Sequence, residues 1–145
     1  SWIEKFDNCI LIREPKYVIN SYIKKNNLKS ILELGYVQQY AIAEYLIKKK
    51  INFFVIDSDK LLDNPTQVLK SWCNHLNLGF DKAMLSWKKG PHKQDGIWGS
   101  HWYDNIYSSS KFIKKKNILS ENYKKFATIY DEAQSYYKKL YNLIV

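Results

Sequence analysis

The stretch Cys9-Ile10-Leu11-Ile12-Arg13-Glu14-Pro15-Lys16-Tyr17-Val18-Ile19-Asn20-Ser21-Tyr22 decides the fold of this chain. Its first four residues form a short apolar run, which is typical of a strand buried on both faces. Pro15 fits the first turn of a helix, and apolar residues recur at helical spacing from Val18 onward. The stretch therefore predicts a strand, a tight turn and a helix over residues 15–26. Arg13 then lies at the carboxyl end of the strand, where open α/β sheets bind ligands.

Arg13 and Ser21 are candidate binding residues because of their spacing. Ser21 stands eight residues after Arg13, about two turns into the predicted helix. A cation at a strand end and a hydroxyl on the following helix can hold one phosphate between them. The alternative is an ordinary strand–turn–helix whose arginine pairs with a surface carboxylate, and the short pattern leaves both readings open.

The same residues resemble the 3′-phosphate-binding segment of the sulfotransferase family, whose members transfer a sulfo group from 3′-phosphoadenosine 5′-phosphosulfate (PAPS). The family pattern is an apolar strand, Arg-x-Pro, and a serine eight residues after the arginine. Here it reads Leu11-Ile12-Arg13-Glu14-Pro15 with Ser21 in register. The resemblance implies an α/β, P-loop NTPase-like three-layer fold. Its parallel sheet would be incomplete at the N-terminal side and would carry an added C-terminal helix.

A second strand–helix unit follows in the family's order. Residues 51–57 form another apolar run, and an acidic turn leads to Asn64 as a helix cap and Pro65 as the first helical residue. The helix closes at Leu76-Asn77-Leu78-Gly79, which is similar to the family's Leu-Gly stop. The resemblance spans roughly residues 8–112.

Residues 87–103 form a loop with three glycines, one proline and clustered aromatic residues. A loop this long in a compact domain is usually functional or mobile, so we expect it to face a nucleotide or a substrate. Lys88-Lys89-Gly90 resembles the family loop that closes over the 3′-phosphate, which implies that Lys89 and Gly90 bind PAPS. The spacing is longer than in the family, and Asp95-Gly96 stands in exchanged order.

The resemblance also exposes what this sequence lacks. The family's Gly/Ser/Thr-rich phosphosulfate loop and its usual base lie upstream of the arginine segment, and no such loop occurs here. His101 is a candidate base without an evident orienting partner, so the catalytic residues stay unassigned. We therefore expect the C-terminal part of a sulfotransferase that modifies an acceptor hydroxyl or amine. The alternative is a non-catalytic nucleotide- or phosphate-binding remnant of the same fold.

Length and net charge limit the kinds of binding partner that we expect. The 145 residues predict one sulfotransferase-like domain over 1–145. A net charge of +9 would attract a nucleotide or a sulfated partner, but the lysines are scattered in pairs and triplets. We therefore expect a small-molecule or glycan acceptor and no nucleic acid. An apolar sheet edge left open by a missing strand would invite self-association.

Cysteine usage and hydropathy give the remaining expectations. Cys9 and Cys73 lie in apolar contexts without metal-ligand spacing, so we expect buried free thiols, no metal and a cytoplasmic location. No apolar run approaches the roughly twenty residues that span a membrane, so we expect no membrane partner.

Residues 120–145 predict a C-terminal amphipathic helix with Ser120 as its N-cap. Its apolar residues repeat at alternating threes and fours, which favours a packed helix over a functional one. They are Tyr123, Phe126, Tyr130, Ala133, Tyr137, Leu140 and Ile144.

Overall fold

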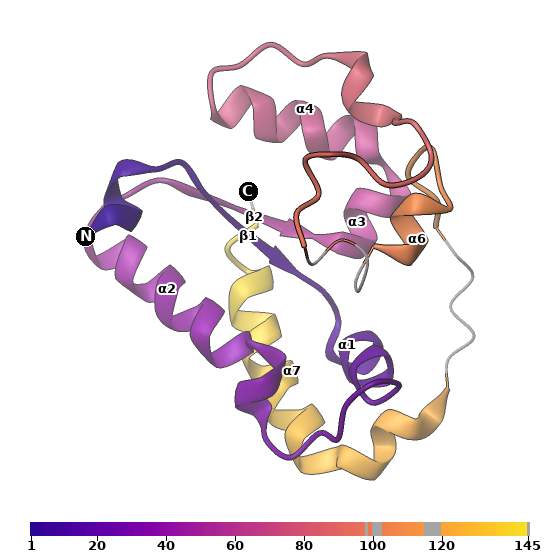
Figure 1. Cartoon of the computed structure of the whole chain (residues 1–145). Coiled ribbons are helices and arrows are strands. Elements are labelled where there is room, and N and C mark those ends of the chain that lie inside the picture. Colours follow the sequence, from indigo (N-terminus) through magenta and orange to yellow (C-terminus); the bar gives the residue numbers. More distant parts are fainter. Residues whose placement is uncertain (98, 100–102, 115–119, 145) are drawn as a thin grey trace. The chain divides into compact units, whose positions relative to one another are not determined.

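A computed structural model describes residues 1–97, 99, 103–114 and 120–144 of the chain. Its contacts divide the chain into two compact units. The first combines Ser1–Lys60 with Lys116–Val145, and the second is Leu61–Lys115. Figure 1 labels the helices and strands of the two units.

The first unit is built on a small parallel sheet. Strand β1 (Asn8–Ile12) pairs with β2 (Phe53–Asp57) in a register that runs from Asn8↔Phe53 to Ile12↔Asp57. Parallel neighbours require a crossover connection, and here it contains helices α1 (Pro15–Tyr22) and α2 (Tyr36–Lys48) with a short 3-10 helix at Ile31–Leu34. The predicted mixed α/β class is confirmed.

The helix boundaries follow local chemistry. Pro15 opens α1 as predicted, but the helix ends at Tyr22 rather than near residue 26. Residues 23–25 form a turn, and the Tyr22 carbonyl accepts from the backbone amides of Lys25 over 3.2 Å and Asn26 over 3.0 Å. Gly35 takes φ 81°, a left-handed conformation that suits glycine, immediately before α2 begins.

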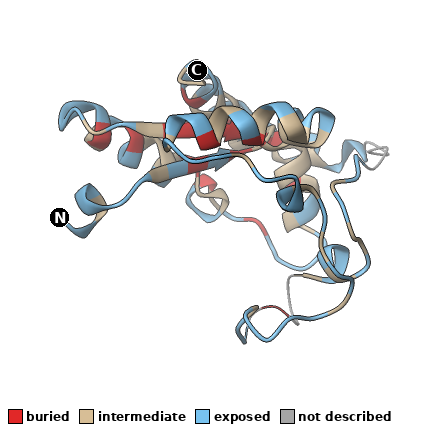
Figure 2. Cartoon of the chain, turned by 90° about the horizontal axis from the view of Figure 1, so that it is seen from above, coloured by how far each residue is buried: buried red, intermediate tan, exposed pale blue. Residues whose placement is uncertain are grey.

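One face of the sheet carries the core. Ile10, Ile12 and Val55 pack with Ala43 of α2 and Leu140 of α7 (Ala127–Tyr141). In Figure 1, α2 and α7 lie side by side, as their mutual contacts require. Figure 2 shows buried positions gathered in strands and helices, with exposed positions dominating the irregular segments.

Strand β1 is not buried on both faces, as its apolar run had predicted. Its burial alternates, so Cys9 and Leu11 are exposed while Ile10 and Ile12 are buried. The prediction of two buried thiols is therefore wrong for Cys9. An all-apolar strand has no polar residue to mark its exposed face, which explains the error. The Gln39 side chain donates to the Leu11 carbonyl over 3.0 Å and so occupies one main-chain acceptor of β1.

The C-terminal segment begins with a tighter helix than the periodicity indicated. Ser120 caps the 3-10 helix Glu121–Phe126 by accepting from the amide of Asn122 over 3.3 Å. Helix α7 then carries Ala133 and Leu140, both fully buried, on the stripe that the spacing outlined.

The second unit contains α4 (Pro65–His75), whose N-terminus is capped by Asn64 through the amide of Gln67 over 3.2 Å. The helix is closed by Asn77 at φ 54°, which takes the left-handed position expected of a glycine. Cys73 is buried, with its sulfur 3.8 Å from that of Met84 in the 3-10 helix Lys82–Leu85. A short helix, α6, spans Asp104–Tyr107.

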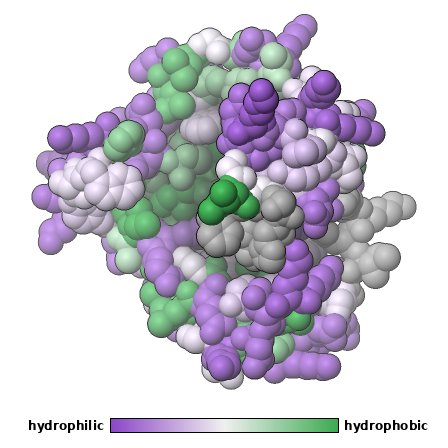
Figure 3. Space-filling view, in the orientation of Figure 1, coloured by the Kyte–Doolittle hydropathy of each residue, from purple (hydrophilic) through white to green (hydrophobic). Residues whose placement is uncertain are grey.

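Among the elements described above, none is long and apolar enough to cross a bilayer. On the face drawn in Figure 3, the apolar residues form separate patches, and hydrophilic residues surround them.

Candidate functional site

The carboxyl ends of β1 and β2 lie at the same edge of the sheet. Ile12 and Asp57 are paired across the strands, so Arg13 and Ser58 follow at adjacent positions beyond the last pair. Neighbouring strands are about 4.8 Å apart, which places both residues at one ligand-binding edge. We call this the strand-end site.

Arg13 is held at the strand-end site by an aromatic ring and a carboxylate. Its Cζ lies 5.2 Å from the centroid of the Tyr17 ring, within cation–π range. Its Nε lies 4.0 Å from Oδ1 of Asp59, at the outer limit of an ion pair. That Nε is buried and has no hydrogen-bond partner among the described residues, although 34% of the side chain is exposed. The guanidinium is therefore oriented but incompletely satisfied.

Ser21 lies in the last turn of α1, and its side chain is exposed. It follows Tyr17 by four residues, so the two occupy one face of the helix. Because the Arg13 guanidinium lies over Tyr17, it lies on the helix face that carries Ser21. The structure gives no direct contact between Arg13 and Ser21.

The main chain of Arg13 is fixed by a buried phenol. Tyr36, the first residue of α2, donates from its hydroxyl to the Arg13 carbonyl over 2.5 Å and is only 2% exposed. Burial raises the pKa of Tyr36 far above its ordinary value, while the nearby Arg13 opposes that shift. Tyr36 therefore remains a neutral donor, and it holds the end of β1 in place.

The main chain beyond β2 is fixed by Asp57, which is 4% exposed. Its Oδ1 accepts from the amides of Asp59 and Lys60, each over 3.0 Å, and so caps helix α3 (Ser58–Asp63). Its Oδ2 accepts from the hydroxyl of Tyr137 over 2.9 Å. Burial, followed by the hydrogen bond to Asp57, raises the pKa of Tyr137 and keeps it protonated.

Sequence reasoning missed α3 and the part that Asp57 plays in it. Residues 58–63 had been interpreted as an acidic turn. An aspartate just before a stretch that ends in Leu61-Leu62 is an N-cap signal, which could have identified the helix. The partnership with Tyr137 had no local signal, because the two residues are 80 positions apart.

The other charges near Arg13 are largely occupied. Lys16 Nζ lies 2.5 Å from Glu14 Oε2, and this hydrogen bond raises the pKa of Lys16. Lys60 Nζ lies 4.3 Å from the centroid of the Tyr141 ring. Arg13 is therefore the cation at the strand-end site that remains best placed for an added anion.

Lys89 and Gly90 belong to the second unit. The Gly90 amide, at φ 95°, donates to the Tyr107 carbonyl over 3.0 Å and is thus used internally. Lys89 is exposed, and no ion pair involves it within the described ranges. His101 lies outside the residues that the structure describes.

Hydrogen bonds hold the first part of the 87–103 loop. The Trp87 amide donates to the Ser110 carbonyl over 2.9 Å, and the His92 amide donates to Asp95 Oδ2 over 2.6 Å. His92 Nε2 also lies 2.8 Å from the Lys88 carbonyl oxygen. The loop is irregular but internally bonded over these residues.

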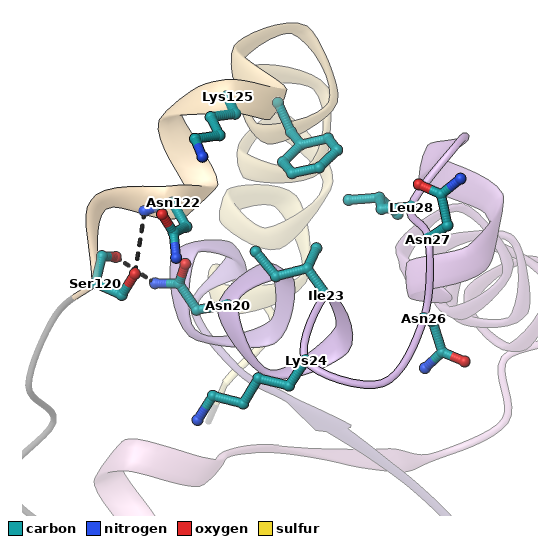
Figure 4. Close-up of a pocket in the computed structure, with 10 residues that line it drawn as sticks. Asn20, Ile23, Lys24, Asn26, Asn27, Leu28, Ser120, Asn122 and Lys125 are labelled. Carbon is teal, nitrogen blue, oxygen red and sulfur yellow. Dashed lines mark hydrogen bonds between the residues drawn. The ribbon is translucent and has the colours of Figure 1, made fainter.

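A surface pocket of about 440 Å³ lies beyond the C-terminal end of α1. Its lining residues are Asn20, Ile23, Lys24, Asn26, Asn27, Leu28, Ser120, Asn122, Lys125 and Phe126. Figure 4 shows Ile23 and Leu28 directed into the hollow and Lys24 directed away from it. Most of the lining residues are exposed, so the pocket is shallow. It lies at the opposite end of α1 from Arg13.

Metal ligands are not grouped in the part of the chain that the structure describes. No cluster of three or more His, Cys, Asp or Glu residues there could hold an ion. The strand-end site presents an arginine and hydroxyl groups, which suit an anion.

The chain belongs to the sulfotransferase family: residues 1–141 match the family model described as "Sulfotransferase domain". Among curated proteins it is similar to the Arabidopsis thaliana "Branched-chain-amino-acid aminotransferase-like protein 1", with 36% identity over 74% of this chain and 19% of the relative. It is also similar to the Arabidopsis thaliana "Branched-chain-amino-acid aminotransferase-like protein 2", with 34% identity over 71% of this chain and 18% of that relative. The chain thus spans less than a fifth of these relatives. No solved structure gives a significant match.

Proposed function

We propose that this chain forms the part of a PAPS-dependent sulfotransferase that binds the 3′-phosphate of the nucleotide. The observation that carries the proposal is Arg13 at the carboxyl end of β1, oriented by Tyr17 and Asp59 with a buried Nε that lacks a partner. A guanidinium can bind two oxygens of a phosphate at once. The proposed fold is P-loop NTPase-like, with the described pair of strands as part of a larger parallel sheet.

Ser21 and Lys89 take supporting roles in this proposal. Ser21 shares the face of α1 over which the Arg13 guanidinium lies, so its hydroxyl can donate to a phosphate held there. Lys89, which is exposed in the second unit, is proposed as a PAPS ligand because Lys88-Lys89-Gly90 resembles the family's nucleotide-binding loop. Gly90 is included through the same resemblance, although its amide is bonded to the Tyr107 carbonyl over 3.0 Å.

These residues are proposed to bind and orient the nucleotide, and the proposal assigns no residue to the transfer of the sulfo group. The acceptor is proposed to be a hydroxyl or amine of a small molecule or glycan. The name of the aminotransferase-like relatives describes proteins more than five times as long as the matched region, so their name assigns no activity to this chain.

The binding claim is tested by calorimetric titration of adenosine 3′,5′-bisphosphate and adenosine 5′-monophosphate at one fixed salt concentration. We expect the bisphosphate to bind at least about tenfold more tightly, because charge-assisted hydrogen bonds to its 3′-phosphate add about 1.5–3 kcal/mol. Arg13→Ala should remove that preference. Lys48→Ala is the matched control, since it deletes one exposed charge at the end of α2.

Equal affinity of the parent chain for both nucleotides contradicts the proposal, as does an Arg13→Ala variant that keeps the preference. Turnover of PAPS is a separate measurement. Binding of the bisphosphate without sulfo transfer to any acceptor favours the non-catalytic alternative for this chain.

A further inference from the structure

We infer that Ser58 is a second hydroxyl ligand of the anion that Arg13 binds, an inference that rests on the proposed function. Two buried polar side-chain atoms at the strand-end site have no hydrogen-bond partner within the described residues: Arg13 Nε and Ser58 Oγ. Arg13 directly follows Ile12 at the end of β1, and Ser58 directly follows Asp57 at the end of β2, so the two residues flank the same strand end. An unmet buried donor is costly, so two of them at one edge point to a ligand that satisfies both.

The Ser58 hydroxyl is free because its neighbour performs the capping. Serine at the start of a helix commonly uses its own oxygen to accept from amides of the first turn. Here the carboxylate of Asp57 accepts from the amides of Asp59 and Lys60, both over 3.0 Å. The Ser58 hydroxyl is thereby left for an external partner.

The position of Ser58 is set before any ligand arrives. Asp57 accepts from the Tyr137 hydroxyl over 2.9 Å through Oδ2, and through Oδ1 it accepts from the amides of Asp59 and Lys60. Preorganised donors lose little conformational entropy when they bind. The residues on either side of Ser58 are thus held by hydrogen bonds, while the Ser58 side chain has no partner within the described residues.

A hydroxyl suits this place electrostatically. Asp59 lies 4.0 Å from Arg13 Nε and already balances part of the guanidinium charge. A neutral donor adds a hydrogen bond to a bound phosphate without attracting a further carboxylate. The ligand class is therefore a phosphate monoester, held by Arg13 from β1 and by Ser58 from β2.

The test compares Ser58→Ala with the parent full-length chain in the same two titrations. We expect Ser58→Ala to weaken binding of adenosine 3′,5′-bisphosphate about tenfold or more and to leave adenosine 5′-monophosphate unchanged. Ser58→Thr, which keeps the hydroxyl, should restore most of the preference. Ser135→Ala is the matched control, because Ser135 is exposed on α7. Thermal melting checks that each variant is folded.

The outcomes separate the two claims. If the parent prefers the bisphosphate and Ser58→Ala shows the same preference, the Ser58 inference is overturned while the proposed function stands. If the parent shows no preference, the proposed function fails first. If Ser58→Ala does not fold, Ser58→Cys, of similar volume and weaker donor strength, replaces it. Undiminished preference in that variant likewise overturns the inference.

Discussion

The hydroxyl of Tyr137 donates to Asp57 Oδ2 over 2.9 Å, and this bond ties the C-terminal helix α7 to the carboxyl end of β2. Asp57 in turn caps α3 through its other oxygen. A residue near the end of the chain therefore stabilises the turn that carries Ser58 and Asp59. Helix α7 supports the strand-end site in addition to packing against the core.

Tyr137→Phe should lower the free energy of unfolding by about 1–3 kcal/mol, because it leaves a buried carboxylate oxygen without its donor. Urea denaturation followed by circular dichroism measures this change. Tyr141→Phe is the control, since its ring packs against Tyr137 at 5.6 Å without bonding Asp57. A similar loss in both variants would show that the effect is not specific to the hydrogen bond between Tyr137 and Asp57.

Alkaline pH should destabilise the fold through Tyr36 and Tyr137. Burial raises the pKa of both in the folded chain, so the unfolded chain loses their protons first. Their stabilisation is present below about pH 10 and is lost as pH rises further, by at most about 1.4 kcal/mol per pH unit for each tyrosine. Solvent screening makes the share of the half-buried Tyr137 smaller.

Urea midpoints at pH 9, 10 and 11 measure this loss. The decline should be shallower in Tyr137→Phe than in the parent, because one shifted group is gone. Identical slopes would mean that Tyr137 ionises at similar pH values in the folded and unfolded chain.

Asp59→Asn should tighten binding of adenosine 3′,5′-bisphosphate about fivefold at low salt. Asp59 lies 4.0 Å from Arg13 Nε, and unit charges at that distance interact by about 1 kcal/mol in a water-like dielectric. The gain should shrink as salt is added, because screening weakens it. Asp63→Asn, whose carboxylate contacts Lys114, is the control. Weaker binding in Asp59→Asn would assign Asp59 to orienting the arginine instead.

Leu140→Ala should destabilise the fold by about 2–5 kcal/mol, because the side chain is fully buried against Ile10, Ile12 and Val55. Leu32→Ala, at a side chain that is 57% exposed, should change the stability by less than about 0.5 kcal/mol. Thermal and urea unfolding of the two variants provide the comparison. A small effect at Leu140 would indicate that α7 is not part of the cooperative core.

Local patterns predicted the elements that local chemistry controls. Pro15 opens α1 and Asn64 caps α4, as predicted. Arg13 was placed at a strand end from its neighbours alone, and the structure has it there. Each of these features depends on residues within a few positions of one another.

The same local patterns could not predict contacts between residues that are far apart in the sequence. Tyr36 reaches Arg13 across 23 positions, and Tyr137 reaches Asp57 across 80. The free hydroxyl of Ser58 could not be foreseen either, because it depends on Asp57 taking the cap. The exposed face of β1 was missed because Cys9 and Leu11 are as apolar as their buried neighbours.

The 80-position span between Asp57 and Tyr137 also orders events during protein synthesis. The ribosome releases the N-terminal part of a chain first, so Arg13 and Asp57 emerge well before Tyr137 has been made. Until α7 is added, Asp57 lacks its phenol and Ile12 lacks Leu140. The anion-binding edge is therefore completed late in translation, and a nascent chain stalled before residue 127 would carry Arg13 without a finished site around it.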